Sequence, residues 1–94
     1  MKKYEVMYII RPNVEEEARK ALIEEMNAVF TSKNSTVDNV KEMGMRELAY
    51  EIKDYTKGLY VVIDTHTTPE AIAEFERLSR INPSVLRHLT LRRD

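Results

Sequence analysis

The sequence contains no cysteine, and only 2 of its 94 residues are glycine and 3 are proline. Without cysteine, neither a disulfide framework nor a thiolate metal site can form. No apolar run approaches the roughly 20 residues that a membrane helix needs, and no signal-peptide core follows the lysines at the N-terminus. We therefore expect a soluble, cytoplasmic protein with no membrane association. Because few glycines and prolines interrupt the chain, almost all of it should be ordered.

The sequence also has no excess of basic or of acidic residues. The chain has 15 basic and 16 acidic residues and a formal net charge of -1. It therefore exerts no long-range attraction on nucleic acid, membranes or charged substrates, and charge-driven binding must come from local clusters. A chain of this length can bury one hydrophobic core but not two. We expect a single domain that spans residues 1–94.

Alternating apolar and polar residues predict four strands. The second strand is unusually long, and its alternation does not hold throughout, which predicts one or more β-bulges. Gly44 is a natural site for one, but the sequence does not fix the position. Turn-forming residues at 54–58 connect the second and third strands as a β-hairpin. The pattern of the last strand does not fix its phase. The predicted strands are Lys3–Ile10, Val37–Lys53, Leu59–Thr67 and Val85–Leu91.

Two segments with apolar residues three and four positions apart predict helices. The first runs from Val14 to Phe30, and Asn13 with Glu16 has the form of an N-cap and its capping partner. The second begins at Thr68-Pro69-Glu70, with a hydroxyl at the N-cap and proline at the first helical position. It ends at Asn82.

The order of the elements is strand, helix, strand, strand, helix, strand. Right-handed crossovers and short connections favour one α+β arrangement for this order. It is the ferredoxin-like split βαβ fold, a four-stranded antiparallel sheet with two helices on one face.

The helices of this fold leave the other face of the sheet uncovered. We expect them to cover Tyr4, Val6 and Tyr8 of the first strand with Val61 and Ile63 of the third. Large exposed apolar patches mark contact sites, so a partner protein on the uncovered face or along the long edge strand is predicted. The alternative is that lysine and glutamate stems shield these side chains. The uncovered face should carry Met7, Ile9, Tyr60, Val62 and one parity of residues 45–52.

Basic residues should gather where the first and last strands pair. A local cluster of this kind predicts phosphate binding, although charged chain ends also serve solubility. Leu59 and Val61 stand where an RNA-recognition module carries stacking aromatics, so base stacking across the sheet is not expected. Weak binding by few charges suits a protein that joins RNA together with a second protein. The basic residues are Lys2, Lys3, Arg92 and Arg93, with Arg87 farther along the last strand.

The segment Gly44–Lys53, GMRELAYEIK, resembles the signature of a known family. In the sixth protein of the bacterial small ribosomal subunit, a glycine, a basic residue, Leu-Ala-Tyr and an isoleucine stand at this spacing. Lys3-Tyr4-Glu5 leading to Arg11-Pro12-Asn13, and Val85-Leu86-Arg87-His88, are similar to that family as well. The resemblance covers essentially the whole chain.

This resemblance implies a structural ribosomal protein of ferredoxin-like fold, located on the cytoplasmic ribosome. It implies binding to the central domain of small-subunit ribosomal RNA jointly with the eighteenth protein of that subunit, and no enzymatic activity, cofactor, metal or small-molecule substrate. On that view Arg46, Leu48 and Tyr50 contact the partner protein and the five basic residues meet phosphates. The sequence ends at Asp94, without the longer tail of many members, so we expect RNA contacts of such a tail to be absent or weaker.

An enzyme would have few groups to use. Asp64 and His66 are two residues apart on one face and could form a base with its orienting carboxylate. No serine or cysteine is placed as a nucleophile, no glycine-rich loop could cradle phosphate, and the spacing of His66 and His88 matches no recognised metal site. The remaining alternative is a ferredoxin-like module that dimerises sheet to sheet and holds a small ligand or performs simple acid/base chemistry.

Overall fold

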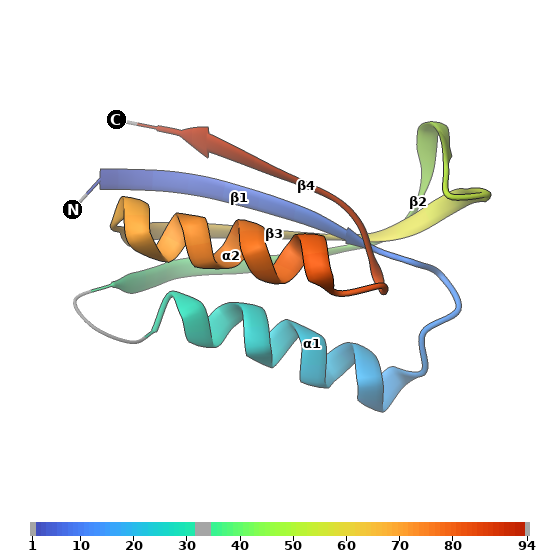
Figure 1. Cartoon of the computed structure of the whole chain (residues 1–94), viewed down its shortest axis with the longest axis horizontal. Coiled ribbons are helices and arrows are strands. Elements are labelled where there is room, and N and C mark those ends of the chain that lie inside the picture. Colours follow the sequence, from blue (N-terminus) through green and yellow to red (C-terminus); the bar gives the residue numbers. More distant parts are fainter. Residues whose placement is uncertain (1, 32–34, 94) are drawn as a thin grey trace.

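The computed structural model describes residues 2–31 and 35–93 and contains one four-stranded sheet and two helices. The sheet has the order β2-β3-β1-β4, and every neighbouring pair is antiparallel. Figure 1 shows both helices on one face of the sheet. The predicted ferredoxin-like fold is therefore confirmed. The elements are β1 (Lys2–Ile10), α1 (Glu16–Val29), β2 (Thr36–Ile52), β3 (Tyr55–Thr67), α2 (Pro69–Ile81) and β4 (Val85–Arg92).

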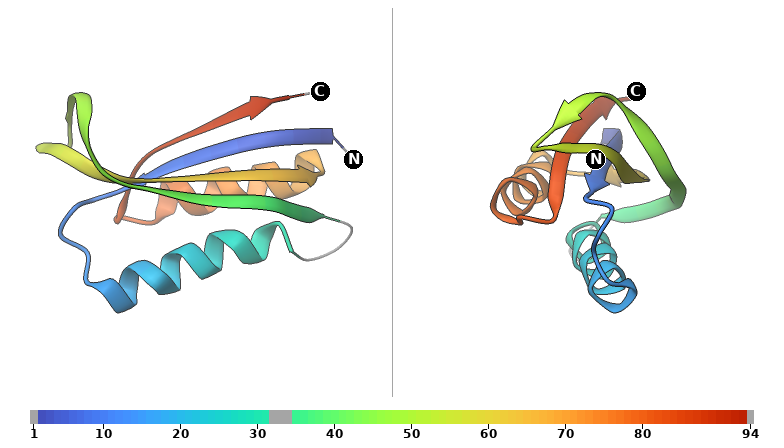
Figure 2. Two further views of the ribbon diagram at one scale, coloured as in Figure 1. Left: turned by 180° about the vertical axis from the view of Figure 1, so that it is seen from behind. Right: turned by 90° about the vertical axis from the view of Figure 1, so that its right-hand side faces the viewer.

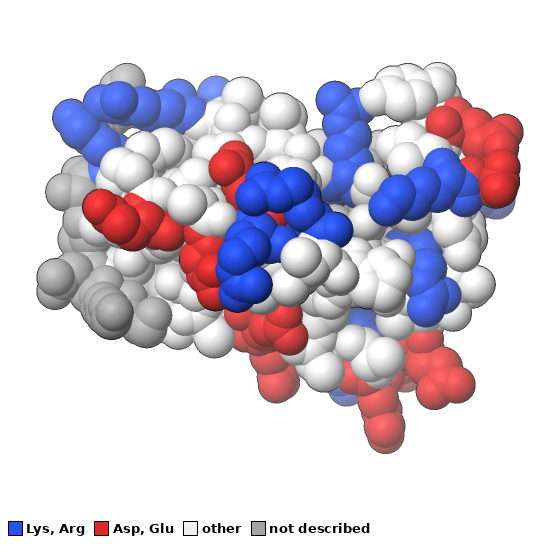
Figure 3. Space-filling view, viewed as in Figure 1, with Lys and Arg blue, Asp and Glu red and all other residues white. Residues whose placement is uncertain are grey.

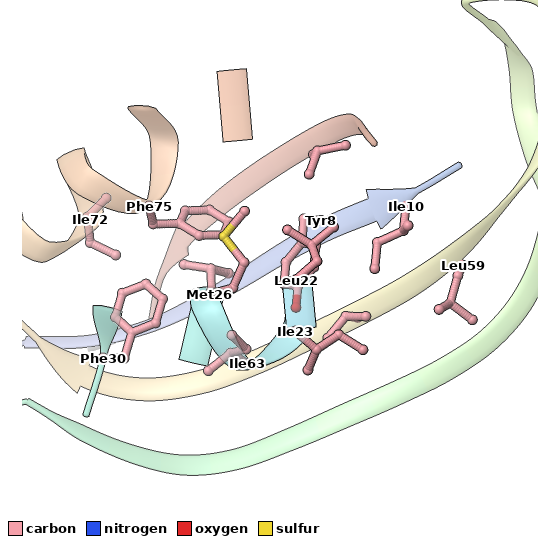
Figure 4. Close-up of a cluster of buried hydrophobic side chains, with 13 residues drawn as sticks. Tyr8, Ile10, Leu22, Ile23, Met26, Phe30, Leu59, Ile63, Ile72 and Phe75 are labelled. Atoms are coloured by element: carbon pink, nitrogen blue, oxygen red, sulfur yellow. The ribbon is translucent and has the colours of Figure 1, made fainter. Parts of the chain in front are cut away.

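The hydrophobic core lies between the helices and the sheet. Met26 of α1, Phe30 at its C-cap and Phe75 of α2 are completely buried and point into this layer (Figure 4). The Phe75 ring lies 5.7 Å from that of Phe30 and 6.0 Å from that of Tyr8, centroid to centroid. Burying each of these side chains contributes about 1.5–3 kcal/mol, so this layer is the main source of stability. The strand residues completely excluded from solvent include Val6, Tyr8, Val61 and Ile63.

The two helices begin differently. Thr68 caps α2 as predicted, because its hydroxyl accepts a hydrogen bond of 3.3 Å from the backbone N–H of Ala71. The N-cap of α1 is Glu15, whose side chain makes no capping hydrogen bond. The prediction that Asn13 caps α1 is wrong, because its Oδ1 accepts a hydrogen bond of 2.6 Å from Arg11 Nη1 instead. Neither helix is long and apolar enough to cross a membrane, among the residues that the structure describes.

The β2–β3 hairpin contains a bulge and a tight turn. The register shifts between Glu42 and Gly44, and Gly44 has φ 83°, which confirms a predicted β-bulge and places it there. The hairpin turns at Lys53 and Asp54, whose φ angles of 50° and 70° suit a two-residue loop. The predicted turn at 54–58 is thus too long, since Gly58 lies inside β3 and is buried.

Candidate functional site

The face of the sheet away from the helices, here called the open face, is charged at one end and apolar at the other. Side chains alternate along β1, so Lys3 and Glu5 occupy the charged end and Met7 and Ile9 the apolar end. The antiparallel register extends this division across the sheet. On β3, His66 pairs with Lys3, Asp64 with Glu5, Val62 with Met7 and Tyr60 with Ile9. On β4, Leu91 pairs with Glu5, Leu89 with Met7 and Arg87 with Ile9.

The apolar half of the open face consists of Met7, Ile9, Tyr60, Val62 and Leu89. Met7, Tyr60 and Val62 are half-buried, and Leu89 is 40 % exposed. Leu91, two residues farther along β4, is 41 % exposed. The helices leave this surface accessible, and its role as a partner contact stays a prediction.

The end of the β2–β3 hairpin, residues 45–58 and here called the hairpin arm, turns away from the helices and over the open face (Figures 1 and 2). A Cβ atom on Gly58 would overlap Ile9 Cγ2 and would lie 3.6 Å from Leu48 Cδ2. Ile9 is accordingly only 3 % exposed. The expectation that Ile9 is open to a partner is wrong, because the arm of the same chain lies against it.

A groove of about 160 Å³ lies between the arm and the sheet. It brings together five of the seven predicted partner contacts from separate parts of the chain, namely Met7, Ile9, Leu48, Tyr50 and Tyr60. Arg46 is not among the groove residues, and its Nε donates a hydrogen bond of 3.3 Å to the carbonyl of Met43. The groove is lined by Met7, Ile9, Leu48, Ala49, Tyr50, Ile52, Tyr60, Arg87 and Leu89.

Arg87 and Tyr50 close one side of this groove. Arg87 Nη1 donates a hydrogen bond to Tyr50 Oη, and the guanidinium carbon lies 5.7 Å from the centroid of the Tyr50 ring. The Tyr50 side chain nevertheless remains largely open, at 58 % exposure of the residue. Arg87 was expected farther along the last strand than Arg92 and Arg93, and β4 indeed pairs it with Ile9, at the other end of β1 from Lys3. Its predicted contact with phosphate stays a prediction.

The remaining four basic residues, Lys2, Lys3, Arg92 and Arg93, form a basic corner beside both chain ends. The N–H of Arg93 donates to the carbonyl of Lys3 at 2.8 Å, and β4 pairs Arg92 with Tyr4. Figure 3 shows Lys and Arg atoms gathered at this end. Alternation places Lys3 and Arg93 on the open face and Lys2 and Arg92 on the other side of the sheet. The basic corner therefore presents cations to both sides.

Carboxylates adjoin the basic corner on the open face. Arg93 Nη2 lies 2.5 Å from Glu5 Oε1. A hollow of about 390 Å³ next to this pair has a mixed lining of Lys3, Asp38, Asn39, Asp64, His66 and Arg93. The open side of the corner thus combines cations with hydrogen-bond acceptors, whereas the sequence predicted a purely basic patch.

Two comparisons with known proteins agree with this geometry. A family model described as Ribosomal protein S6 matches residues 3–92. The chain is also similar to the crystal structure of 30S ribosomal protein S6 from Thermotoga maritima, with 39 % sequence identity and a TM-score of 0.90 over 98 % of this chain and 87 % of that chain. This chain belongs to the ribosomal protein S6 family. The resemblance seen in GMRELAYEIK is confirmed, and the chain is a ribosomal protein of the small-subunit S6 type.

The histidines of this S6-family chain lie on opposite sides of the sheet. His66 Nδ1 is 2.6 Å from Asp38 Oδ2, whereas Asp64 Oδ2 lies 3.9 Å from Lys41 Nζ. The suggested pairing of Asp64 with His66 is therefore replaced by one between His66 and Asp38. His88 faces the helices, where its ring meets Phe75 edge-on at 6.0 Å. Within residues 2–31 and 35–93, no group of three or more His, Cys, Asp or Glu could hold a metal ion.

The sequence analysis missed two features of the S6-family open face. Leu89 and Leu91 were not identified, although both alternate with the polar residues His88 and Thr90, and this alternation was a usable signal. The contact between Arg87 and Tyr50 spans 37 residues. No pattern in the sequence indicates it, because it depends on how far the arm curves.

Proposed function

We propose that this S6-family chain binds the central domain of small-subunit ribosomal RNA jointly with the eighteenth protein of the subunit. The observation that carries the proposal is the division of the open face. An apolar half with its groove adjoins a basic corner on one sheet, so one chain can contact a protein and a phosphate backbone at the same time. Neither surface is extensive by itself, which favours joint binding over binding to either partner alone.

The apolar half and the arm would receive the partner protein. The exposed apolar residues there are large, and Met45 is 48 % and Tyr50 58 % exposed. Exposed tyrosine and methionine are typical of the central contacts of protein interfaces. Leu48, Met7, Tyr60 and Val62 would supply the surrounding apolar contact, and Arg46 would lie at the edge.

The basic corner would receive the RNA backbone. Lys3 and Arg93 face the same side as the apolar half, so RNA bound there would lie beside the partner protein. Lys2 and Arg92 extend the corner around the sheet edge. With few cations and adjacent carboxylates, the RNA affinity of the chain alone should be low, and it should fall further as salt is added. Arg87, which lies with the groove, is excluded from this patch.

The proposal is tested by mixing the full chain, the eighteenth protein and a central-domain RNA fragment, and measuring binding with each component left out. We expect tight RNA binding only when both proteins are present. RNA binding that is equally tight without the eighteenth protein would contradict joint binding.

Paired variants locate the two surfaces. Leu89→Glu should abolish binding of the eighteenth protein, whereas Ile81→Glu, a matched change at a 62 % exposed residue of α2, should leave it intact.

Lys3→Ala and Arg93→Ala should each reduce the slope of log K against log salt by about 1 in the assembled complex. Lys20→Ala on α1 is the control that should keep the slope.

A sheet-to-sheet dimer that holds a small ligand is the second candidate. It is favoured only by the 390 Å³ hollow, whose lysine, arginine, histidine and carboxylate groups could hold a polar molecule. A tight homodimer in analytical ultracentrifugation that binds neither RNA nor the eighteenth protein would support it.

A further inference from the structure

We propose that Arg87 is a positioning residue, which holds the hairpin arm over the open face through Tyr50 and so preforms the groove for the partner protein. This inference rests on the proposed function for the identity of the partner. It assigns Arg87 a role different from that of the basic corner.

The position of Arg87 separates it from the basic corner. Arg87 lies opposite Ile9, and the corner lies beside Lys3 at the other end of β1. Six residues of extended strand span about 20 Å. A phosphate held between Lys3 and Arg93 is therefore out of reach of Arg87, whose guanidinium is already directed to Tyr50.

The outer part of the arm needs such a contact. In the hairpin register the pairing runs from Glu47↔Lys57 directly to Ile52↔Tyr55, with an irregularity between them. A two-stranded ribbon that leaves its sheet is only marginally stable in water. Its position over the sheet is set by Gly58 against Ile9 and by the pair of Tyr50 with Arg87.

The groove exists only while the arm is held in this position. Its lining comes from β1, β4 and the arm, so an arm that swings away separates Tyr50 from Leu89 and opens the groove. A partner could then bind only those chains in which the arm is in place, or would have to order the arm on binding. The apparent affinity would fall in proportion to the fraction of chains that have the arm in place. The hydrogen bond and the cation–π contact join the same two side chains. Arg87→Ala therefore removes both contacts, whereas Tyr50→Phe removes only the hydrogen bond and keeps the ring beside the guanidinium.

Hydrogen–deuterium exchange of the full chain tests whether Arg87 holds the arm. We expect the arm amides to exchange about 3- to 10-fold faster in Arg87→Ala and by a smaller factor in Tyr50→Phe, which loses only the hydrogen bond, with the double variant no faster than Arg87→Ala. The amides of β1 and β3 residues 59–67 should be unaffected. Arg87→Lys keeps the charge but loses the planar guanidinium. Its arm amides should therefore exchange faster than in wild type and no faster than in Arg87→Ala.

Binding measurements on the same proteins test the consequence. The Kd for the eighteenth protein should rise in Arg87→Ala and by a smaller factor in Tyr50→Phe, in step with the exchange of the arm, while the salt dependence of RNA binding stays unchanged. Arg93→Ala should show the reverse pattern. Unchanged exchange of the arm in Arg87→Ala, or a reduced salt slope in that variant alone, would overturn the proposal. If the wild-type chain binds neither partner, the proposed function fails, and the exchange data alone decide whether Arg87 holds the arm.

Discussion

Gly58 lies directly against Ile9, and the two residues set how closely the hairpin arm approaches the sheet. A Cβ atom on Gly58 would overlap Ile9 Cγ2 and would come within 3.3 Å of the carbonyl oxygen of Ile10. The backbone of Ile10 cannot move away without disturbing β1. Glycine at this position is therefore what allows the arm to leave the sheet while Ile9 stays covered.

Substitution of Gly58 by alanine should lower the free energy of unfolding by about 1–3 kcal/mol, because the added methyl group overpacks the contact with Ile9. Gly44→Ala is the matched control. A Cβ there meets no atom within 4 Å, and only its φ of 83° is strained, at a cost of about 1 kcal/mol. Urea denaturation measures both variants. A Gly58→Ala chain as stable as wild type would show that the arm does not pack against Ile9 in solution.

Tyr8 carries a hydroxyl that is buried in the core without a hydrogen-bond partner among the described residues. An unsatisfied buried hydroxyl costs about 1–3 kcal/mol. Tyr8→Phe should therefore leave the free energy of unfolding unchanged or raise it by up to about 1 kcal/mol. Phe75→Ala is the contrasting variant and should lose about 3–5 kcal/mol. Thermal and urea unfolding measure both, and a clear loss in Tyr8→Phe would reveal a partner for the hydroxyl, such as a bound water.

The same hydroxyl makes stability depend on alkaline pH. Burial, with a smaller contribution from the charge of Glu42, raises the pKa of Tyr8 well above its ordinary value of 10.0. Above pH 10 the unfolded chain releases this proton while the folded chain keeps it. Rising pH therefore favours the unfolded state, and the free energy of unfolding falls. Unfolding free energies measured from pH 8 upward should decline less steeply in Tyr8→Phe than in wild type. Tyr60→Phe, a matched change on the open face, should keep the steeper decline.

Substitution of Thr68 and of Asn13, which lie near the starts of the two helices, should lower the free energy of unfolding by different amounts. Thr68→Ala removes the hydroxyl that caps α2 and should lower the free energy of unfolding by about 1 kcal/mol. Asn13→Ala should cost less, because Asn13 contacts Arg11 and does not cap α1. Urea denaturation compares the two. Equal losses would indicate that Asn13 stabilises α1 in solution after all.

Local sequence patterns were sufficient for the architecture. The alternation of β1 and β3, the spacing of apolar residues in α1, and the Thr68-Pro69 start of α2 each reflect short-range chemistry that acts within a few residues. Gly44 marked the bulge for the same reason, because few other residues adopt a positive φ at low cost. The helix-facing residues Tyr8 and Val61 followed from parity alone.

The sequence predicted the position of most candidate site residues on the sheet, and their binding roles stay predictions. Parity placed Met7 and Tyr60 on the open face, and strand pairing brought Lys3 and Arg93 together. Ile9 was expected to be exposed, and this expectation failed because the hairpin arm lies back over the sheet. The separation of Arg87 from the basic corner follows from the register of β4 with β1.

The amino-acid sequence by itself determined the elements, their order and the sorting of side chains between the two faces of the sheet, because these depend on residue type and period. Only the tertiary structure decided that the arm covers Ile9, that Arg87 meets Tyr50, and that a groove lies between them. Those relations depend on the accumulated bend of the hairpin and on the packing of residues distant in the chain. Such long-range geometry leaves no periodic signal in the sequence.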